Sequence, residues 1–169
     1  VPDALYAGDL KGNLWKIDVS SDDPANWGVA LSGTALAVAK TSATPLTGCT
    51  ANATRPITNP PAVTWHPNSI EQAMVYFGSG KYIESSDVST DTCDAFYGVW
   101  DNNSQTNSDR TNFVSQTIQT DATTSERTIQ SESPISAWGT HTAGDSTYTG
   151  WVQDLPLRER QTGAISVLG

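Results

Sequence analysis

Hydrophobic residues in this chain fall into short runs, and each run is bounded by Gly, Pro, Asn or Asp. The runs are rich in β-branched and aromatic residues, whereas the apolar spacing of three or four positions that marks a helix is almost absent. The pattern therefore predicts an all-β chain of ten strands. The expected strands are residues 5–9, 13–19, 35–41, 62–65, 73–78, 96–100, 113–120, 126–131, 150–155 and 164–168.

Polar segments separate these strands, and the clearest are residues 20–27, 101–112 and 137–149. None of them has the length or composition of an interdomain linker. At 169 residues the chain is long enough to bury a hydrophobic core. We therefore expect residues 1–169 to form one domain, or a contiguous part of one.

The first two predicted strands form a hairpin typical of a blade in quinoprotein-like β-propellers. Residues 6–18 read YAGDLKGNLWKID, with a turn at Gly12 and Asn13. A tight turn requires positive φ, which glycine and asparagine tolerate, and Trp15 is placed to fill the layer between blades. The hairpin favours a propeller but indicates little about function, because propellers support many activities.

The composition fits an extracytoplasmic β-protein. Hydrophobic residues make up 37% of the chain and charged residues 16%, while six Trp and five Tyr supply large side chains to a core. The net charge is −9, from 18 acidic and 9 basic residues. Such a surface repels phosphate backbones, so we expect no nucleic-acid partner.

Two cysteines, Cys49 and Cys93, admit two interpretations. They could be buried free thiols, as in many cytosolic proteins, or they could form one disulfide. Both lie in turn-like segments rich in Ser, Thr, Asn and Asp rather than in apolar runs, which favours the disulfide. Two cysteines cannot make a four-ligand zinc site, and His66 and His141 lack metal-ligand spacing with them.

Known catalytic and nucleotide-binding patterns are missing from the sequence. Residues 78–81 read GSGK, but a phosphate loop needs G-x-x-x-x-G-K-[S/T] and a following helix, and Tyr82 breaks the pattern. The sequence also contains no G-x-S-x-G, no H-E-x-x-H and no nucleophilic Cys–His pair. We expect neither an enzyme nor a nucleotide-binding protein.

Two further patterns have a functional and a purely structural interpretation. Residues 101–109 place oxygen-bearing side chains at alternate positions, as a calcium loop does, but they lack its glycine at position six and its acidic cluster. A solvated surface loop is therefore favoured. A platform for stacking sugars could come from Trp65, Trp100, Trp138 and Trp151, although blade cores account for most propeller tryptophans.

Four stretches in order resemble the PilY family, the type IV pilus tip-associated biogenesis factors and adhesins. The first is the hairpin of residues 6–18, and the second runs from RPITNPP at 55–61 to the His-Pro pair at 66–67. The third is MVYFGSGKYIE at 74–84 followed by FYGVWD at 96–101. The fourth is GWVQDLP at 150–156, with Glu-Arg just beyond. The ordered set is far more specific than any one stretch.

The resemblance implies a non-enzymatic module that acts in type IV pilus assembly, in pilus extension against retraction and in surface adhesion, modulated by calcium. The implied partners are pilin subunits or minor pilins and a host or abiotic surface. The implied location is extracytoplasmic, at the pilus tip, the outer membrane or the periplasm in transit. The family's propeller is larger than this chain, so we expect its later blades, about three to four of them, as part of a single domain.

The resemblance also implies a calcium site at the start of the chain. In this family a loop of the form D-x-D-x-D-G-V-P-D commonly runs into the Y-A-G-D hairpin, and Val1-Pro2-Asp3 matches its last three positions. Val1 would offer its backbone carbonyl and Asp3 its carboxylate to Ca²⁺. The leading acids would lie upstream, since the chain starts without an initiator Met and is expected to be a piece of a longer protein. The alternative is that Asp3 is merely a turn acid.

Two other classes of protein remain as alternatives. One is a scaffolding propeller of the outer-membrane assembly type, which would lack the paired FGSGKYIE and YGVWD segments. The other is a quinoprotein dehydrogenase, which would need adjacent paired cysteines and a full ring around its cofactor. The propeller hypothesis further predicts four-stranded antiparallel blades with Trp15, Phe77 and Trp100 largely buried between them.

Overall fold

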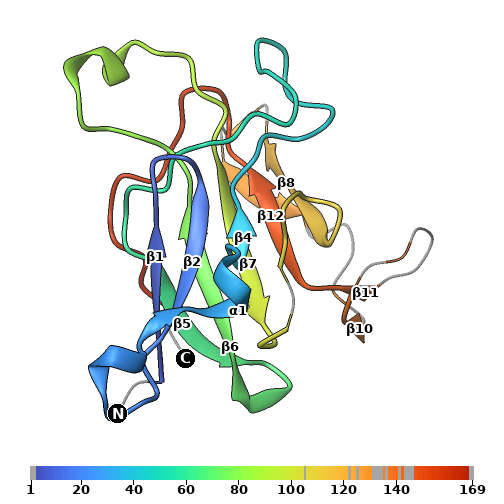
Figure 1. Cartoon of the computed structure of the whole chain (residues 1–169). Coiled ribbons are helices and arrows are strands. Elements are labelled where there is room, and N and C mark those ends of the chain that lie inside the picture. Colours follow the sequence, from blue (N-terminus) through green and yellow to red (C-terminus); the bar gives the residue numbers. More distant parts are fainter. Residues whose placement is uncertain are drawn as a thin grey trace.

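A computed structural model describes residues 3–104, 106–121, 123–124, 126–130, 135, 137–140, 142 and 147–167. The fold of the described residues is built mostly from β-strands, arranged in two main sheets and one separate two-stranded sheet, with little helix (Figure 1). The prediction of an all-β chain is therefore confirmed. None of the helices in the described residues is long and apolar enough to cross a membrane.

The first sheet grows from the predicted N-terminal hairpin. Strands β1 (Ala4–Gly8) and β2 (Asn13–Asp18) pair antiparallel, with Ala7 opposite Trp15. Two short strands, β3 (Gly28–Val29) and β4 (Ala37–Val38), pair with opposite ends of β2. Gly12 turns the hairpin with a φ of 86°, as the sequence predicts. A side chain there would lie 2.5 Å from the Arg55 carbonyl oxygen, so the position requires glycine.

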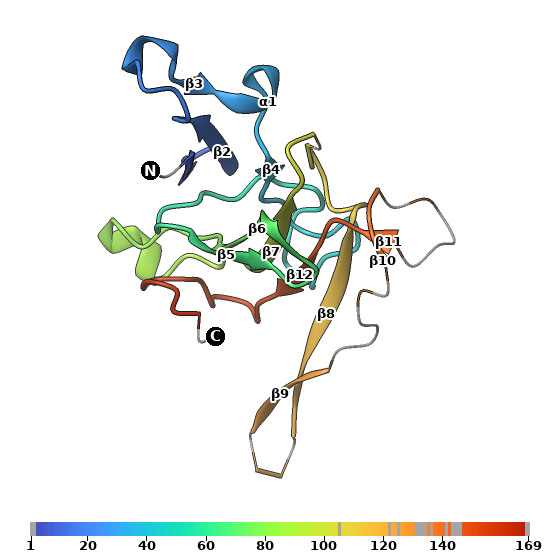
Figure 2. The same cartoon turned by 90° about the horizontal axis from the view of Figure 1, so that it is seen from below.

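The second sheet contains the expected blade and extends it. Strands β5 (Ala62–His66), β6 (Ser69–Gly78), β7 (Ala95–Asp101) and β12 (Gly150–Asp154) form four antiparallel strands in that order. The hairpin of β8 (Phe113–Thr120) and β9 (Arg127–Gln130) continues the sheet beyond β12, and Figure 2 shows it projecting from the body. Because β8 runs parallel to β12, this sheet has six strands and is not purely antiparallel, contrary to the prediction.

The remaining elements are short. They are η1 (Pro24–Asn26), α1 (Ala30–Gly33), η2 (Ser85–Val88), and the parallel pair β10 (Ala137–Trp138) and β11 (Thr147–Tyr148). The predicted strand at 35–41 shrinks to β4, because its remaining backbone groups bond to loops such as 53–55. The predicted strand at 164–168 is wrong over its described residues, 164–167, which form no strand.

The hydrophobic core lies between the two sheets. The first sheet and its following loop contribute Leu14, Leu36, Ala37, Ala39 and Ile57, and the second sheet contributes Val75, Phe77, Ala95, Tyr97, Val99, Phe113 and Val152. Phe77 is fully buried, as predicted, and its ring stacks on Tyr97 with centroids 4.8 Å apart. Trp15 and Trp100 are only half-buried, which differs from the prediction. Each alternates with two buried neighbours along its strand and so points to the face away from the core, where its indole N–H donates to a polar side chain.

Candidate functional site

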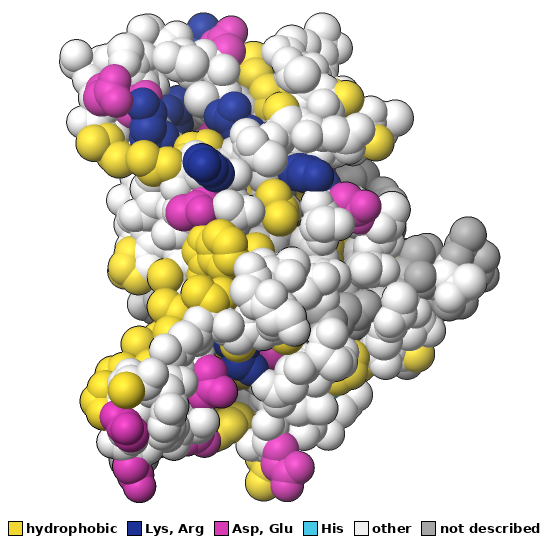
Figure 3. Space-filling view, viewed as in Figure 1, with side chains coloured by type: hydrophobic (Ala, Val, Ile, Leu, Met, Phe, Trp, Pro, Cys, Tyr) yellow, Lys and Arg dark blue, Asp and Glu magenta, His cyan; other side chains and the backbone are white. Residues whose placement is uncertain are grey.

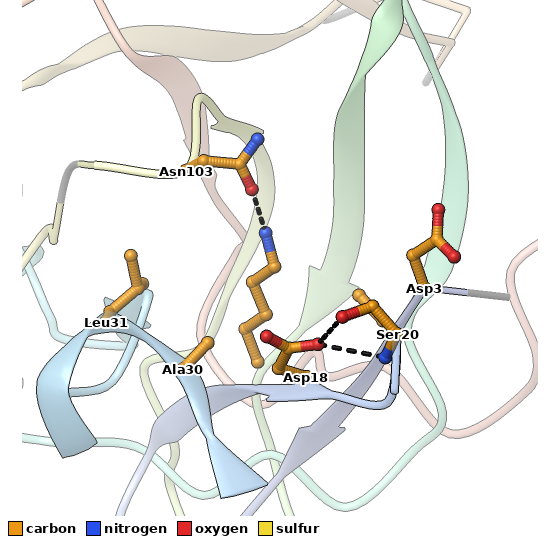
Figure 4. Close-up of a pocket in the computed structure, with 8 residues that line it drawn as sticks. Asp3, Asp18, Ser20, Ala30, Leu31 and Asn103 are labelled. Carbon is orange, nitrogen blue, oxygen red and sulfur yellow. Dashed lines mark hydrogen bonds between the residues drawn. The ribbon is translucent and has the colours of Figure 1, made fainter. Parts of the chain in front are cut away.

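A polar groove opens between the N-terminal hairpin, α1 and the loop that follows β7, and Figure 4 shows the residues that line it. Its volume is about 400 Å³. Asp3 lies just before β1 and Asp18 ends β2, whereas Asn103 comes from the loop that follows β7. On the face seen in Figure 3, Lys and Arg side chains gather mostly toward the upper end, whereas Asp and Glu side chains are spread from the upper to the lower end.

A buried ion pair closes the floor of this groove and joins the two sheets. Lys16 of β2 lies with its Nζ 2.6 Å from an Asp101 carboxylate oxygen at the end of β7, and it also donates to Asn103. Tyr6 of β1 donates its hydroxyl hydrogen to Asp101 at 2.6 Å. Burial, together with the hydrogen bond to Asp101, raises the pKa of Tyr6 far above its usual value. Lys16 and Asp101 expose 11% and 2% of their side chains, so water screens the pair poorly.

Asp3, the predicted calcium ligand, lies at the rim of the groove. Its residue is exposed, and its backbone carbonyl accepts a hydrogen bond from the Val19 N–H at 3.1 Å, which extends the hairpin. The other predicted ligand, Val1, lies outside the described residues. Within the part of the chain that the structure describes, no three His, Cys, Asp or Glu side chains are grouped closely enough to hold a metal ion. A carboxylate such as Asp3 fits Ca²⁺ as one oxygen ligand, and further oxygens would have to join it.

The hairpin turn is organised by Asp9, a residue whose role the sequence pattern did not reveal. Its carboxylate accepts hydrogen bonds from the Lys11 and Asn13 backbone N–H groups, the Asn13 amide and the Trp15 indole, at 2.8–3.0 Å. Partial burial acts to raise the pKa of Asp9, but these hydrogen bonds outweigh it and hold the pKa below its usual range. The Gly-Asp step before a Gly-Asn turn could have indicated such a cap.

Cys49 and Cys93 form a disulfide, so the free-thiol alternative is wrong. Their Cα atoms are 5.9 Å apart, and the bond ties the loop after β4 to the segment that leads into β7. The next residue, Asp94, is buried and accepts hydrogen bonds from the Arg55 guanidinium at 3.0 Å and the Ser79 hydroxyl at 3.1 Å. The disulfide and this charge pair therefore fasten the same two segments side by side.

The two segments that mimic known binding loops have structural roles. Lys81 of the GSGK stretch pairs with Glu84 and Asp87, and Ser79 is buried in the sheet. The loop at 101–109 is less solvated than expected, because Asp101 and Asn107 are buried. The backbone of Asn107 exchanges hydrogen bonds with the segment 36–38, so this loop anchors the two sheets together.

Together the fold and these contacts define a disulfide-linked, two-sheet piece of a propeller-like protein. Comparison with known proteins then identifies the family. Residues 1–133 match the family model described as the PilY1 beta-propeller domain, and the chain belongs to this family. The fold is accordingly a partial β-propeller. No solved structure matches the chain.

Curated relatives carry the same description. The chain is 34% identical over 192 residues to a type IV pilus biogenesis factor PilY1 of Pseudomonas aeruginosa strain PAO1, covering 99% of this chain and 16% of the relative. It is 29% identical over 207 residues to the protein of strain UCBPP-PA14, covering 99% and 17%. It is 33% identical over 163 residues to the PilY1 homolog of Xylella fastidiosa strain Temecula1, covering 92% and 10%. The chain thus spans less than a fifth of each of these relatives.

The family and the disulfide together indicate an extracytoplasmic location, since disulfides persist in oxidising compartments. Of the four family stretches, the first folds as the β1–β2 hairpin, the third as β6 and β7, and the fourth as β12. The second stretch instead packs against the core. Its Ile57 is buried against Gly8, where any side chain on that glycine would collide with it.

Proposed function

We propose that this chain is a non-enzymatic module of type IV pilus assembly and surface adhesion, and that calcium modulates its part in pilus extension and retraction. The observation that carries the proposal is the match of residues 1–133 to the PilY1 beta-propeller domain. The relatives are named as type IV pilus biogenesis factors, which supports pilin subunits or minor pilins as partners and the pilus tip as the location. A host or abiotic surface would be the adhesive target.

The dehydrogenase alternative finds no support. Its adjacent paired cysteines are absent from the sequence, and the two cysteines here lie 44 residues apart and bind each other across two loops. Against the scaffolding alternative, the sequence contains the paired FGSGKYIE and YGVWD segments. The first segment begins at the end of β6, where Phe77 pairs with Tyr97 of the second segment in β7. Neither alternative is needed to explain the described residues.

Deleting the gene from the organism that carries it tests the assembly function. We expect fewer surface pili, measured by shearing cells and quantifying pilin, with restoration by the natural full-length gene. Disabling retraction in the same strain should restore pili in part, because the proposed role is to favour extension over retraction. Unchanged piliation and unchanged surface attachment after deletion would refute the proposal.

Calcium modulation is tested at Asp3. In the natural full-length protein, Asp3→Ala should weaken Ca²⁺ binding in calorimetry, because a carboxylate ligand is lost. Asp22→Ala is the matched control, since Asp22 is an exposed acid on a nearby loop of the same sheet. Equal Ca²⁺ affinity in the wild type and the Asp3 variant would show that Asp3 is only a turn residue.

A further inference from the structure

The second sheet presents an aromatic surface on the side that faces away from the core. Along β6, the core side is formed by Val75 and Phe77, so Tyr76 between them points to the opposite face. Tyr76 is registered with Gly98 of β7, and Gly98 is registered with Trp151 of β12. These three positions therefore form a row across three neighbouring strands, with glycine in the middle.

Gly98 allows the indole of Trp151 to lie across the sheet. A Cβ atom at Gly98 would come within 2.5 Å of Cε2 and Nε1 of Trp151, so the ring rests directly over the glycine backbone. The rings of Tyr76 and Phe96 flank it, with centroids 6.2 Å and 5.7 Å away. Trp151 is half-buried, which leaves part of the indole open on the outer side.

A second indole stands beside this platform. Trp138 of β10 packs edge-on against His66 with centroids 4.4 Å apart, and against Trp100 at 6.1 Å. Trp138 and Trp151 both line a cleft of about 380 Å³, together with Tyr76, Met74 and the amide side chains of Asn68 and Gln116. This volume lies in the range of small-ligand sites.

One polar group in the cleft lacks a partner. The Gln116 side-chain oxygen is buried and has no hydrogen-bond partner among the described residues. An unpaired buried polar group costs free energy, so a ligand that supplies hydroxyl groups would be favoured.

We propose that this cleft binds a neutral pyranose unit of a glycan. The apolar C–H face of a pyranose ring stacks on a flat indole, and its hydroxyl groups both donate to and accept from amides such as Asn68 and Gln116. No charged side chain is among the described residues that line the cleft, and the chain carries a net charge of −9, which disfavours an anionic sugar. Trp65, by contrast, is 69% exposed and lies outside this cleft.

This proposal deepens the adhesive part of the proposed function by naming its chemical target. The competing occupant is an apolar surface of another blade or of a second copy of the chain. A wholly apolar partner would leave the Gln116 oxygen unpaired, whereas a sugar hydroxyl can donate a hydrogen bond to it. The lining therefore favours the sugar.

Direct binding in solution tests the site. The probes are the methyl glycosides of glucose, galactose, mannose and N-acetylglucosamine, studied with the purified protein by saturation-transfer NMR and calorimetry. We expect saturation of the ring C–H protons of at least one of them. Trp151→Ala should weaken its binding at least tenfold, whereas Trp151→Phe should retain part of it because an aromatic face remains.

Two further variants separate recognition from folding. Gln116→Leu keeps the side-chain volume and should weaken binding about tenfold through the lost hydrogen bonds. Trp27→Ala, which removes an exposed indole from the first sheet's loop, should leave binding unchanged.

Failure of all four probes to bind, or equal affinity in wild type and Trp151→Ala, would overturn the proposal. So would a dimer, found by sedimentation, that Trp151→Ala converts to monomer. The glycoside-binding experiments are independent of the piliation assay, so a failure of this proposal can be distinguished from a failure of the proposed function.

Discussion

At the scale of single residues, the buried side chain of His66 shows how its surroundings set the protonation of an imidazole ring. It ends β5 and packs against the rings of both Trp100 and Trp138. Its Nδ1 accepts a hydrogen bond from the Asn68 N–H at 3.1 Å, so the neutral ring carries its proton on Nε2. Burial disfavours the charged imidazolium and holds the pKa of His66 below its usual range.

This lowered pKa predicts a loss of stability in mild acid. The unfolded chain takes up a proton on His66 near pH 6.5, whereas the folded chain resists protonation until a lower pH. Stability should therefore be highest above pH 6.5 and should fall as the pH drops below it. His66→Asn keeps an acceptor for the Asn68 N–H and removes the titration. Urea unfolding at pH 7.5 and 5.5 should show a smaller difference for this variant than for wild type, and an equal difference would contradict the prediction.

At the scale of elements, loops are held by specific links rather than by strand pairing. The loop after β4 is tied to β7 by the Cys49–Cys93 disulfide and by the ion pair between Arg55 and Asp94. The hairpin turn between β1 and β2 is held by the Asp9 carboxylate. The strands themselves are short, so these links decide how the segments between them lie against the core.

Removing the disulfide should lower stability without changing the fold. Because it closes a 44-residue separation, the chain-entropy model gives about 4 kcal/mol of stabilisation for Cys49 and Cys93. Cys49→Ser, Cys93→Ser and the double variant should lose similar amounts in denaturant unfolding, with unchanged circular dichroism before unfolding. Peptide mapping under non-reducing conditions should recover the linked peptides from the wild type. Recovery of only free-thiol peptides from exported protein would contradict the structure.

At the scale of the whole molecule, two sheets share one core and are joined by a buried polar network. The aromatic pair of Phe77 and Tyr97 fills the middle of the interface, and the Tyr97 hydroxyl donates to the Lys40 carbonyl at 2.7 Å. At one end of the interface, Lys16 of the first sheet pairs with Asp101 of the second. The groove with Asp3 at its rim therefore depends on how the two sheets dock.

Removing one charge of the Lys16–Asp101 ion pair should lower the free energy of unfolding more than removing both charges. Asp101→Leu leaves Lys16 buried without its counter-ion, and we expect a loss of about 3 kcal/mol or more in unfolding free energy. Lys16→Met combined with Asp101→Leu should recover much of that loss, because two apolar side chains replace two buried charges. A double-mutant cycle measures the coupling. Additive effects of the two substitutions would show that the pair does not couple the sheets.

The amino-acid pattern alone is enough to predict the strands with strong local signals and to identify the family. The 6–18 hairpin and the strands at β6, β7 and β12 combine β-branched or aromatic runs with glycine-bounded turns, so local preference and tertiary fold agree. The pattern also favoured the disulfide, although a pattern of turns could not exclude free thiols. The calcium ligand Asp3 stays a prediction that depends on residues beyond the described ones.

The pairings between distant segments, by contrast, depend on how the whole chain packs. The parallel contact of β8 with β12 and the burial of Asp101 and Asn107 in a polar loop each depend on residues far apart in the chain. Trp138 and Trp151 line one cleft although their strands belong to different sheets. Such contacts depend on which faces of the sheets pack against each other. The sequence pattern around a polar or aromatic residue does not show whether that residue is buried or exposed. Local preference could therefore predict the strands, whereas the groove and the aromatic cleft follow from the docking of whole sheets.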